Sequence, residues 1–130
     1  MHRTIPLAIL AVLAILAALL LAAGCTGQVP ATVVPSGGLS GSVSKVEDHW
    51  NLGLGCYWRV YGTVFNTGSA DASNVVAYVQ LIDTSTGDIR DSKTIALGSL
   101  AKGDSRSFEV SLDGECDRTY RVEVRPMAGA

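Results

Sequence analysis

The chain has 130 residues, a length typical of a single domain, and a net charge of −2 at pH 7. Binding to nucleic acid or attraction to an anionic membrane requires clustered excess Lys and Arg, and ten basic against twelve acidic residues do not supply it. The composition therefore excludes nucleic acid as an expected partner. The mean hydropathy of +0.30 is high for a soluble domain. An apolar amino terminus accounts for most of that value.

The first 25 residues have the pattern of an export signal or a membrane anchor. A run without charge extends from Ile5 to Ala23, after Arg3 and before Gly24-Cys25. As a helix this run would span about 28 Å, close to the ~30 Å hydrocarbon core of a bilayer, so an uncleaved anchor is physically possible. The alternative is a secretory signal that ends in small residues at a cleavage site.

The end of this run, Leu20-Leu21-Ala22-Ala23-Gly24-Cys25, resembles the lipobox of prokaryotic lipoproteins, with Ala22 where leucine is usual. In that family the signal is cut before the cysteine, and the cysteine sulfur carries a diacylglycerol. The resemblance implies a signal peptide over residues 1–24 and a lipid on Cys25. Two acyl chains hold a protein at a membrane stably, whereas one does not. We expect this lipid anchor on the cell membrane, with an intact transmembrane helix as the alternative; both place the remaining chain on the extracytoplasmic side.

Residues 25–42 are expected to be a lipidated cysteine followed by a flexible linker. The segment from Thr26 to Ser42 contains Pro30, Pro35, four glycines and several Ser and Thr. Such a composition buries too little apolar surface to offset the conformational entropy of the chain.

From Val43 onward the sequence predicts strands separated by turns. The clearest strand has Cys56, Trp58, Val60, Gly62 and Val64 on one face, and strict alternation of this kind indicates that one face packs on a core. A glycine inside such a strand usually marks a bulge or a close backbone approach. The predicted strands cover residues 43–50, 56–66, 74–83, 89–97 (one bent strand or two short ones), 105–112 and 119–125.

No segment after residue 25 has apolar residues at helical spacing, and turn-forming residues recur every 8–12 positions. Six or seven short strands in this arrangement predict an all-β fold, an antiparallel β-sandwich of immunoglobulin-like type over residues 43–126. The hydrophobic signal or anchor helix would precede it.

Turn and core positions carry a family resemblance from Val60 to about Val124. They comprise Val60-x-Gly62-x-Val64-x-Asn66-Thr67-Gly68, Ala72-x-Asn74-Val75, Val79-x-Leu81-Ile82-Asp83, Gly87 and Leu97-Gly98-x-Leu100-x-x-Gly103-Asp104-Ser105-x-x-Phe108. This pattern resembles the FxLYD domain and is similar to CARDB modules, both immunoglobulin-like sandwiches of secreted prokaryotic proteins. Val79 and Ile82 replace the Phe and Tyr of the naming motif. The resemblance implies a shape, a compartment and a binding role, and it transfers no catalytic residue.

Lipidation of Cys25 would leave Cys56 and Cys116, an even pair in an exported domain, which is the setting in which disulfides persist. We expect these two cysteines to form a disulfide, with two buried free thiols as the alternative. A metal site is not expected, because two cysteines without CxxC spacing and a single histidine beyond residue 25 cannot complete a tetrahedral shell.

No catalytic residues or cofactors are predicted. His49 has no nucleophile signature around it, so we interpret it as a solvated or capping side chain. Asp83, Ser85, Asp88 and Asp91 lack the order of a calcium loop, and these residue types favour turns on conformational grounds alone.

Trp50, Tyr57, Tyr61 and Tyr78 are the candidate interaction surface. Alternation places Tyr57 and Tyr61 on the face opposite Trp58, where flat amphipathic rings would suit a partner protein or a surface polymer such as a sugar. Ordinary cross-strand packing is the simpler interpretation of these rings. The expected function is non-catalytic interaction by a membrane-anchored extracytoplasmic module. The alternative is a lipoprotein that captures a ligand for an envelope complex, which an aromatic-lined pocket would favour.

Overall fold

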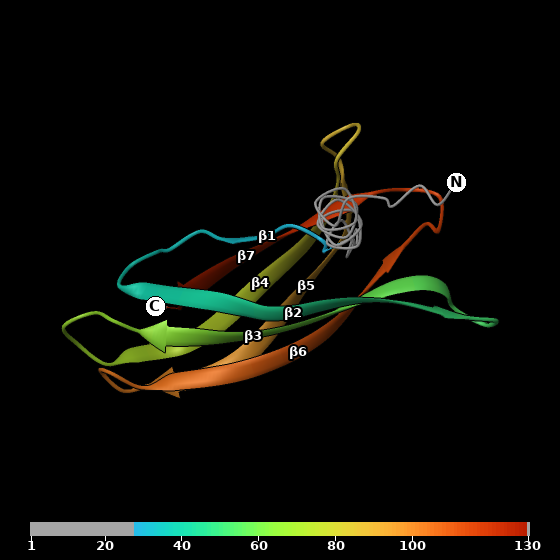
Figure 1. The fold of residues 1–130 in the computed structure, drawn as a ribbon. Helices are drawn as coiled ribbons and strands as arrows, with labels where there is room; N and C mark the ends of the chain where they lie inside the picture. The colour runs from blue at the N-terminus through green and yellow to red at the C-terminus, as the bar shows by residue number, and fades with distance from the viewer. Residues whose placement is uncertain (1–27, 130) are drawn as a thin grey trace, which may run out of the picture.

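A computed structural model describes residues 28–129, which form seven strands in two sheets packed face to face (Figure 1). The strands are β1 (Ala31–Val33), β2 (Leu39–Asn51), β3 (Gly55–Asn66), β4 (Ala72–Asp83), β5 (Ile89–Leu100), β6 (Ser105–Gly114) and β7 (Tyr120–Ala128). The signal or anchor expected over residues 1–24 and the lipid attachment at Cys25 lie outside the described residues. Within residues 28–129, no helix is long and apolar enough to cross a membrane.

The two sheets have the strand orders β1-β7-β4-β5 and β2-β3-β6. The hairpins β2–β3 and β4–β5 each stay within one sheet, while the β3–β4, β5–β6 and β6–β7 connections cross between sheets. All pairings are antiparallel except that of β1 with β7, which is parallel. The prediction of an all-β fold with six or seven strands is confirmed, and the parallel edge pair is the one departure from the expected antiparallel arrangement.

The core lies between the sheets, and the alternation in the sequence predicted its members correctly. Val60 and Val64 of β3 are completely buried, as are Val79 and Leu81 of β4, which face them from the other sheet. A side chain on a strand points to one face at every second residue, so a strand with one buried face shows the pattern directly. The other buried apolar residues include Leu39, Trp58, Val75, Ala77, Leu97, Leu100, Phe108, Val110, Leu112, Tyr120, Val122 and Val124.

Gly62 lies in β3, opposite a β-bulge in the neighbouring strand β2. The register of β2 against β3 shifts between Val43 and Lys45, directly opposite Gly62. A Cβ atom at Gly62 would lie 2.5 Å from Cζ of Phe108 and 2.8 Å from the backbone oxygen of Ser42. The prediction of a bulge or close approach is confirmed, and both occur here.

The linker expected up to residue 42 is shorter than predicted. Residues 31–33 form β1, and β2 begins at Leu39, whose side chain is only 1% exposed. The backbone of this segment is held by β7, because the Val122 amide donates to the Pro30 oxygen and the Val34 amide to the Val124 oxygen, each at 2.9 Å. The expectation of a flexible segment is therefore wrong for residues 31–33 and 39–42, because pairing partners distant in sequence satisfy their backbone groups.

Deleting residues 28–35 from a fragment that covers residues 28–130 is expected to reduce the free energy of unfolding by about 2 kcal/mol, because it removes the backbone bonds to β7 and the partial burial of Val29 and Val33. It should also expose an edge of β7 and promote self-association. Urea titration and sedimentation of the two fragments measure both effects. Equal stability and a monomeric short fragment would show that β1 is dispensable.

Strand ends elsewhere extend past the predicted limits. β5 is one strand that continues from Leu97 to Leu100, with Leu100 buried as expected. β6 reaches Gly114, past the predicted end at residue 112, and β7 continues to Ala128, past the predicted end at residue 125. These ends continue because neighbouring strands pair with them, and such pairing has no local signal in the sequence.

Candidate interaction surface

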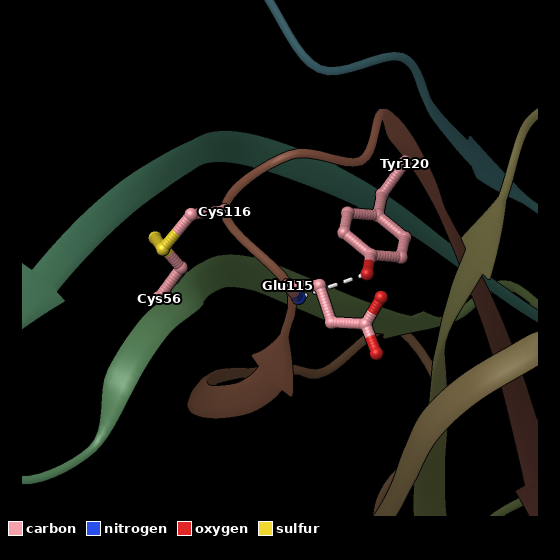
Figure 2. The surroundings of a disulfide bond; sticks show 4 residues. All are labelled: Cys56, Glu115, Cys116 and Tyr120. Carbon is pink, nitrogen blue, oxygen red and sulfur yellow. Dashed lines mark hydrogen bonds between the residues drawn. A yellow bond between two sulfur atoms is a disulfide. The ribbon is translucent and has the colours of Figure 1, made fainter.

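One end of the sandwich is fastened by a disulfide (Figure 2). Cys56 at the start of β3 is bonded to Cys116 in the β6–β7 loop, with Cα atoms 5.2 Å apart, so the expected pairing is confirmed. Next to it, the ring of Trp58 packs edge-on against Tyr120, with ring centroids 4.7 Å apart. The Tyr120 hydroxyl accepts a hydrogen bond of 2.9 Å from the Glu115 amide, which ties the start of β7 to the loop that precedes it.

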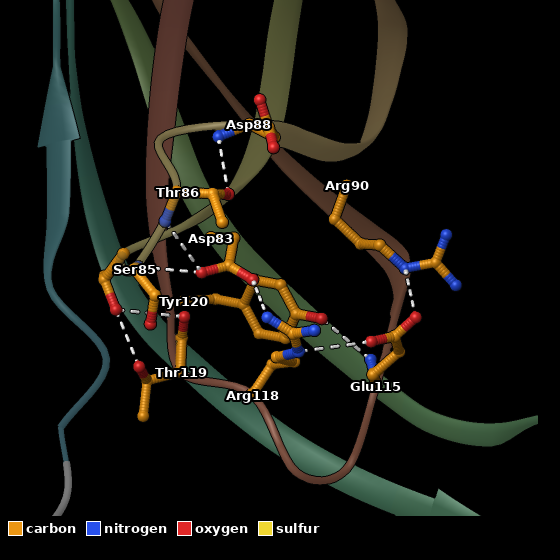
Figure 3. A network of polar contacts seen from close by, with 10 residues as sticks. Asp83, Ser85, Thr86, Asp88, Arg90, Glu115, Arg118, Thr119 and Tyr120 are labelled. Atoms are coloured by element: carbon orange, nitrogen blue, oxygen red, sulfur yellow. Dashed lines mark hydrogen bonds and ion pairs between the residues drawn. The ribbon is translucent and has the colours of Figure 1, made fainter.

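Polar contacts at the same end join the β4–β5 turn to the β6–β7 loop (Figure 3). Asp83 is 8% exposed; its carboxylate accepts from the Ser85 amide at 2.7 Å and lies 3.4 Å from Nη1 of Arg118. Arg118 and Arg90 both approach Glu115, at 3.5 and 3.9 Å. Two of the acidic residues that the sequence raised as calcium ligands, Asp83 and Asp91, already have partners for their oxygens in the protein; Asp91 accepts from the Ser92 and Asp113 amides, each at 2.8 Å.

We define the outer face as the solvent side of the β2-β3-β6 sheet. The strand register places its members in rows across the three strands, because directly opposed residues share a face. These rows are His49–Tyr57–Asp113, Glu47–Arg59–Ser111 and Lys45–Tyr61–Glu109. Tyr57 and Tyr61 are half-buried, so each presents part of a ring among charged neighbours.

Charged groups on the outer face are paired across and along the strands. A hydrogen bond from Lys45 lowers the pKa of the Glu47 carboxyl, and the same bond raises the pKa of Lys45. Nε of Arg59 lies 3.3 Å from Oε1 of Glu109. The face therefore offers fixed donors and acceptors of both signs between two tyrosine rings.

The four aromatic residues predicted as one surface are divided among three places. Tyr57 and Tyr61 share the outer face, as alternation predicted. Tyr78 belongs to β4 and lies on the solvent side of the other sheet, paired with Thr94 and Arg125. Trp50 is opposite Cys56 near the tip of the β2–β3 hairpin and is 64% exposed. The prediction of a single patch from all four is wrong, because Tyr78 belongs to the other sheet, and Trp50, paired with Cys56, alternates to the side of β2 opposite that of Tyr57 and Tyr61.

His49 belongs to the outer face and makes an aromatic contact. Its ring stacks on Tyr57, with centroids 5.2 Å apart and an interplanar angle of 16°. Nε2 of His49 lies 3.5 Å from Oε2 of Glu47 without forming a hydrogen bond. The geometry extends the aromatic surface of Tyr57 by one ring.

Among the depressions on the described part of the molecule, one of about 310 Å³ beside Cys116 is lined by two aromatic side chains, Trp58 and Tyr120, and the others have one or none. The largest, about 560 Å³, lies at the end opposite the disulfide and is lined by glycine, serine, alanine, asparagine and aspartate. The depression on the outer face, about 280 Å³ beside Tyr57 and Arg59, has one aromatic side chain. Among residues 28–129, no group of three or more His, Cys, Asp or Glu is placed to hold a metal ion.

Comparison with models of protein families, with curated proteins and with solved structures gives no match for this chain.

Sequence reasoning missed two exposed residues next to Trp50. Leu52 and Leu54 in the β2–β3 turn are 92% and 68% exposed, and they lie between the strands predicted over residues 43–50 and 56–66, where the sequence predicts no site. The signal that could have found them is the absence of charge from Trp50 to Trp58, which is unusual for a loop and its flanking strands.

Proposed function

We propose that the protein is a membrane-anchored extracytoplasmic module whose β-sandwich is non-catalytic and binds a protein or a surface polymer. The anchor would be the lipid on Cys25 or the apolar helix before it. The main observation in favour of an extracytoplasmic location is the Cys56–Cys116 disulfide, because disulfides form and persist in oxidising compartments. The same chain has an apolar amino-terminal segment with a lipobox-like end, which is the kind of signal that directs export.

We propose further that the sandwich is of immunoglobulin-like type and related to FxLYD and CARDB modules. Two features support this. Strand hairpins stay within sheets while other connections cross between them, as in Greek-key sandwiches. Tyr120, at the start of a strand, bonds through its hydroxyl to the backbone five residues upstream, an arrangement known in immunoglobulin-like folds as the tyrosine corner.

The outer face is the binding surface that we favour. Rings of His49, Tyr57 and Tyr61 alternate there with paired charges, and aromatic and Arg side chains are the groups that dominate protein interfaces. An open, sheet-borne surface suits a macromolecule better than the enclosed apolar pocket that a small ligand requires.

Photo-crosslinking in intact cells tests this assignment. A photoreactive phenylalanine analogue at Tyr57 or Tyr61 of the full-length protein is expected to give a discrete adduct. The same analogue at Tyr78 is the matched control, because Tyr78 is also half-buried but lies on the solvent side of the other sheet. Adducts of equal yield at all three positions, or none at Tyr57 and Tyr61, would contradict an interface on the outer face.

A further inference from the structure

The β2–β3 hairpin ends in an exposed apolar tip, which we define as Trp50, Leu52 and Leu54. Their exposed fractions are 64%, 92% and 68%, and no charged residue occurs between His49 and Arg59. The hairpin extends past the other strands at the right of the view in Figure 1. Three large apolar side chains displayed together on a projecting turn indicate a surface that another apolar phase covers.

The turn that displays the tip is fixed by its own hydrogen bonds. The Asn51 side-chain oxygen accepts from the amides of Gly53 at 2.8 Å and Leu54 at 2.9 Å. Gly55 closes the turn with a φ of 73°, a conformation that glycine adopts without strain. Two backbone donors of the turn are therefore satisfied within it, which lowers the cost of moving the tip out of water.

The tip and the amino-terminal connection lie at the same end of the sandwich. Ala31 pairs with Val122, near the start of β7, and Gln28 lines one depression together with Asp48 and the residues around Cys116. Because Asp48 and Gln28 line the same depression, they lie at a similar level along the sandwich. The hairpin continues from Asp48 to Leu52, so at ~3.3 Å per residue its tip lies about 13 Å beyond Gln28.

The chain between the anchor and the sandwich is too short to hold this end far from a membrane. Only Thr26 and Gly27 separate Cys25 from Gln28. Three residue steps span at most about 11 Å when fully extended. A lipid on Cys25 would thus keep Gln28 within about 11 Å of the bilayer surface. The hairpin tip lies about 13 Å beyond Gln28, so it would be able to reach that surface.

We propose that the apolar tip inserts into the interfacial region of the bilayer that anchors the chain, and so fixes the orientation of the sandwich on the membrane. This inference rests on the membrane attachment proposed above. Trp is enriched at membrane–water interfaces because its ring combines an apolar body with an N–H donor, and Leu side chains bury in the adjacent acyl region. The opposite end of the sandwich, where β7 ends, then points away from the membrane.

Fluorescence quenching in vesicles tests the proposal. Full-length protein extracted from membranes is reconstituted into phosphatidylcholine vesicles whose acyl chains either carry bromine near the headgroup or do not. The emission of Trp50 is obtained by subtracting the spectrum of the Trp50→Phe variant from that of the wild type. This subtraction removes the contribution of buried Trp58. We expect bromine to quench more than about half of that emission, since the tip lies at the depth of the quencher.

A reporter at the far end provides the matched control. Phe65→Trp in the Trp50→Phe background places an indole nine residues along β3 from Cys56, about 30 Å from the hairpin end, and should not be quenched. The double substitution Leu52→Asp and Leu54→Asp should abolish quenching of Trp50 without changing the thermal melting of the protein, because both residues are exposed.

The outcomes separate the two proposals. Protein that floats with the vesicles while Trp50 is quenched no more than the far reporter would overturn tip insertion and leave the anchor intact. Protein that does not float would remove the anchor, and tip insertion with it. An emission shift that follows protein concentration and not bromine would assign the tip to a second copy of the chain, which also overturns insertion.

Discussion

Replacing Cys56 and Cys116 together by serine is expected to lower the free energy of unfolding of the fragment 28–130 by about 4 kcal/mol. The bond closes a loop with a sequence separation of 60, and in the chain-entropy description a loop of this length restricts the unfolded chain by that amount. For a domain of this size the melting temperature should fall by roughly 20 °C. Calorimetry of the oxidised protein and the double variant measures the difference directly.

Reduction of the wild type provides the control for this prediction. Treatment with a thiol reductant should bring its melting temperature to that of the double variant, and should leave the variant itself unchanged. Strand content measured by circular dichroism should persist in both at low temperature, because the core is built from apolar residues of both sheets. A melting temperature that is insensitive to reduction would contradict a stabilising role for this bond.

The substitution Gly62→Ala is expected to cost about 3 kcal/mol, the upper part of the range for an overpacked core. The new methyl group would lie 2.5 Å from Cζ of Phe108, a side chain that is 6% exposed, and 2.8 Å from the backbone oxygen of Ser42. The ring has little room to move, and the carbonyl belongs to a paired strand. Urea titration of the variant fragment should show the loss without a change in slope.

Gly53→Ala is the matched control for Gly62→Ala, because its methyl group would meet only the Asn51 side-chain oxygen at 3.5 Å. It should be neutral or slightly stabilising, since alanine restricts the unfolded chain more than glycine. Phe108→Leu combined with Gly62→Ala should recover part of the loss relative to the sum of the single variants. Equal stabilities of the two alanine variants would show that the contact at Gly62 is relaxed at no cost.

Alternation in the sequence predicted the interior of the fold well because it reports a physical constraint that acts on each strand separately. Val60 and Val64 had to face one way and Tyr57 and Tyr61 the other, whichever strand became the neighbour. The same reasoning identified Gly62, because a residue without a side chain inside a strand implies something close by. Local pattern was sufficient for these features.

Features that depend on distant pairing could not be predicted in this way. Residues 31–33 lie in a Pro- and Gly-containing segment, and only β7, about ninety positions later, gives them a partner. Leu39 is buried although Gly and Ser surround it, because β2 runs along the full length of β3. For the candidate site, alternation placed Tyr57 and Tyr61 correctly. Whether Tyr78 lies beside them depends on which sheet contains β4, and that is decided by tertiary packing, which has no local signal in the sequence.

The length of chain between Cys25 and the first strand determines how far the proposed anchor would let the sandwich lie from the membrane. With a linker ending at residue 42 the sandwich would have been free to lie well away from the bilayer. With β1 beginning at Ala31, only five residues separate it from Cys25, so the lipid proposed on Cys25 would hold one end of the sandwich near the surface. In the proposed arrangement the bilayer would then lie within reach of the exposed hairpin tip.

Intact-mass measurement of the gene product extracted from membranes distinguishes an exported, lipid-anchored chain from one that stays in the cytoplasm. We expect a chain that begins at Cys25, carries a diacylglycerol on the Cys25 sulfur and is lighter by two hydrogens for the Cys56–Cys116 bond. A mass that begins at Met1 with all three thiols free, from protein recovered in the cytoplasm, would contradict both export and anchoring.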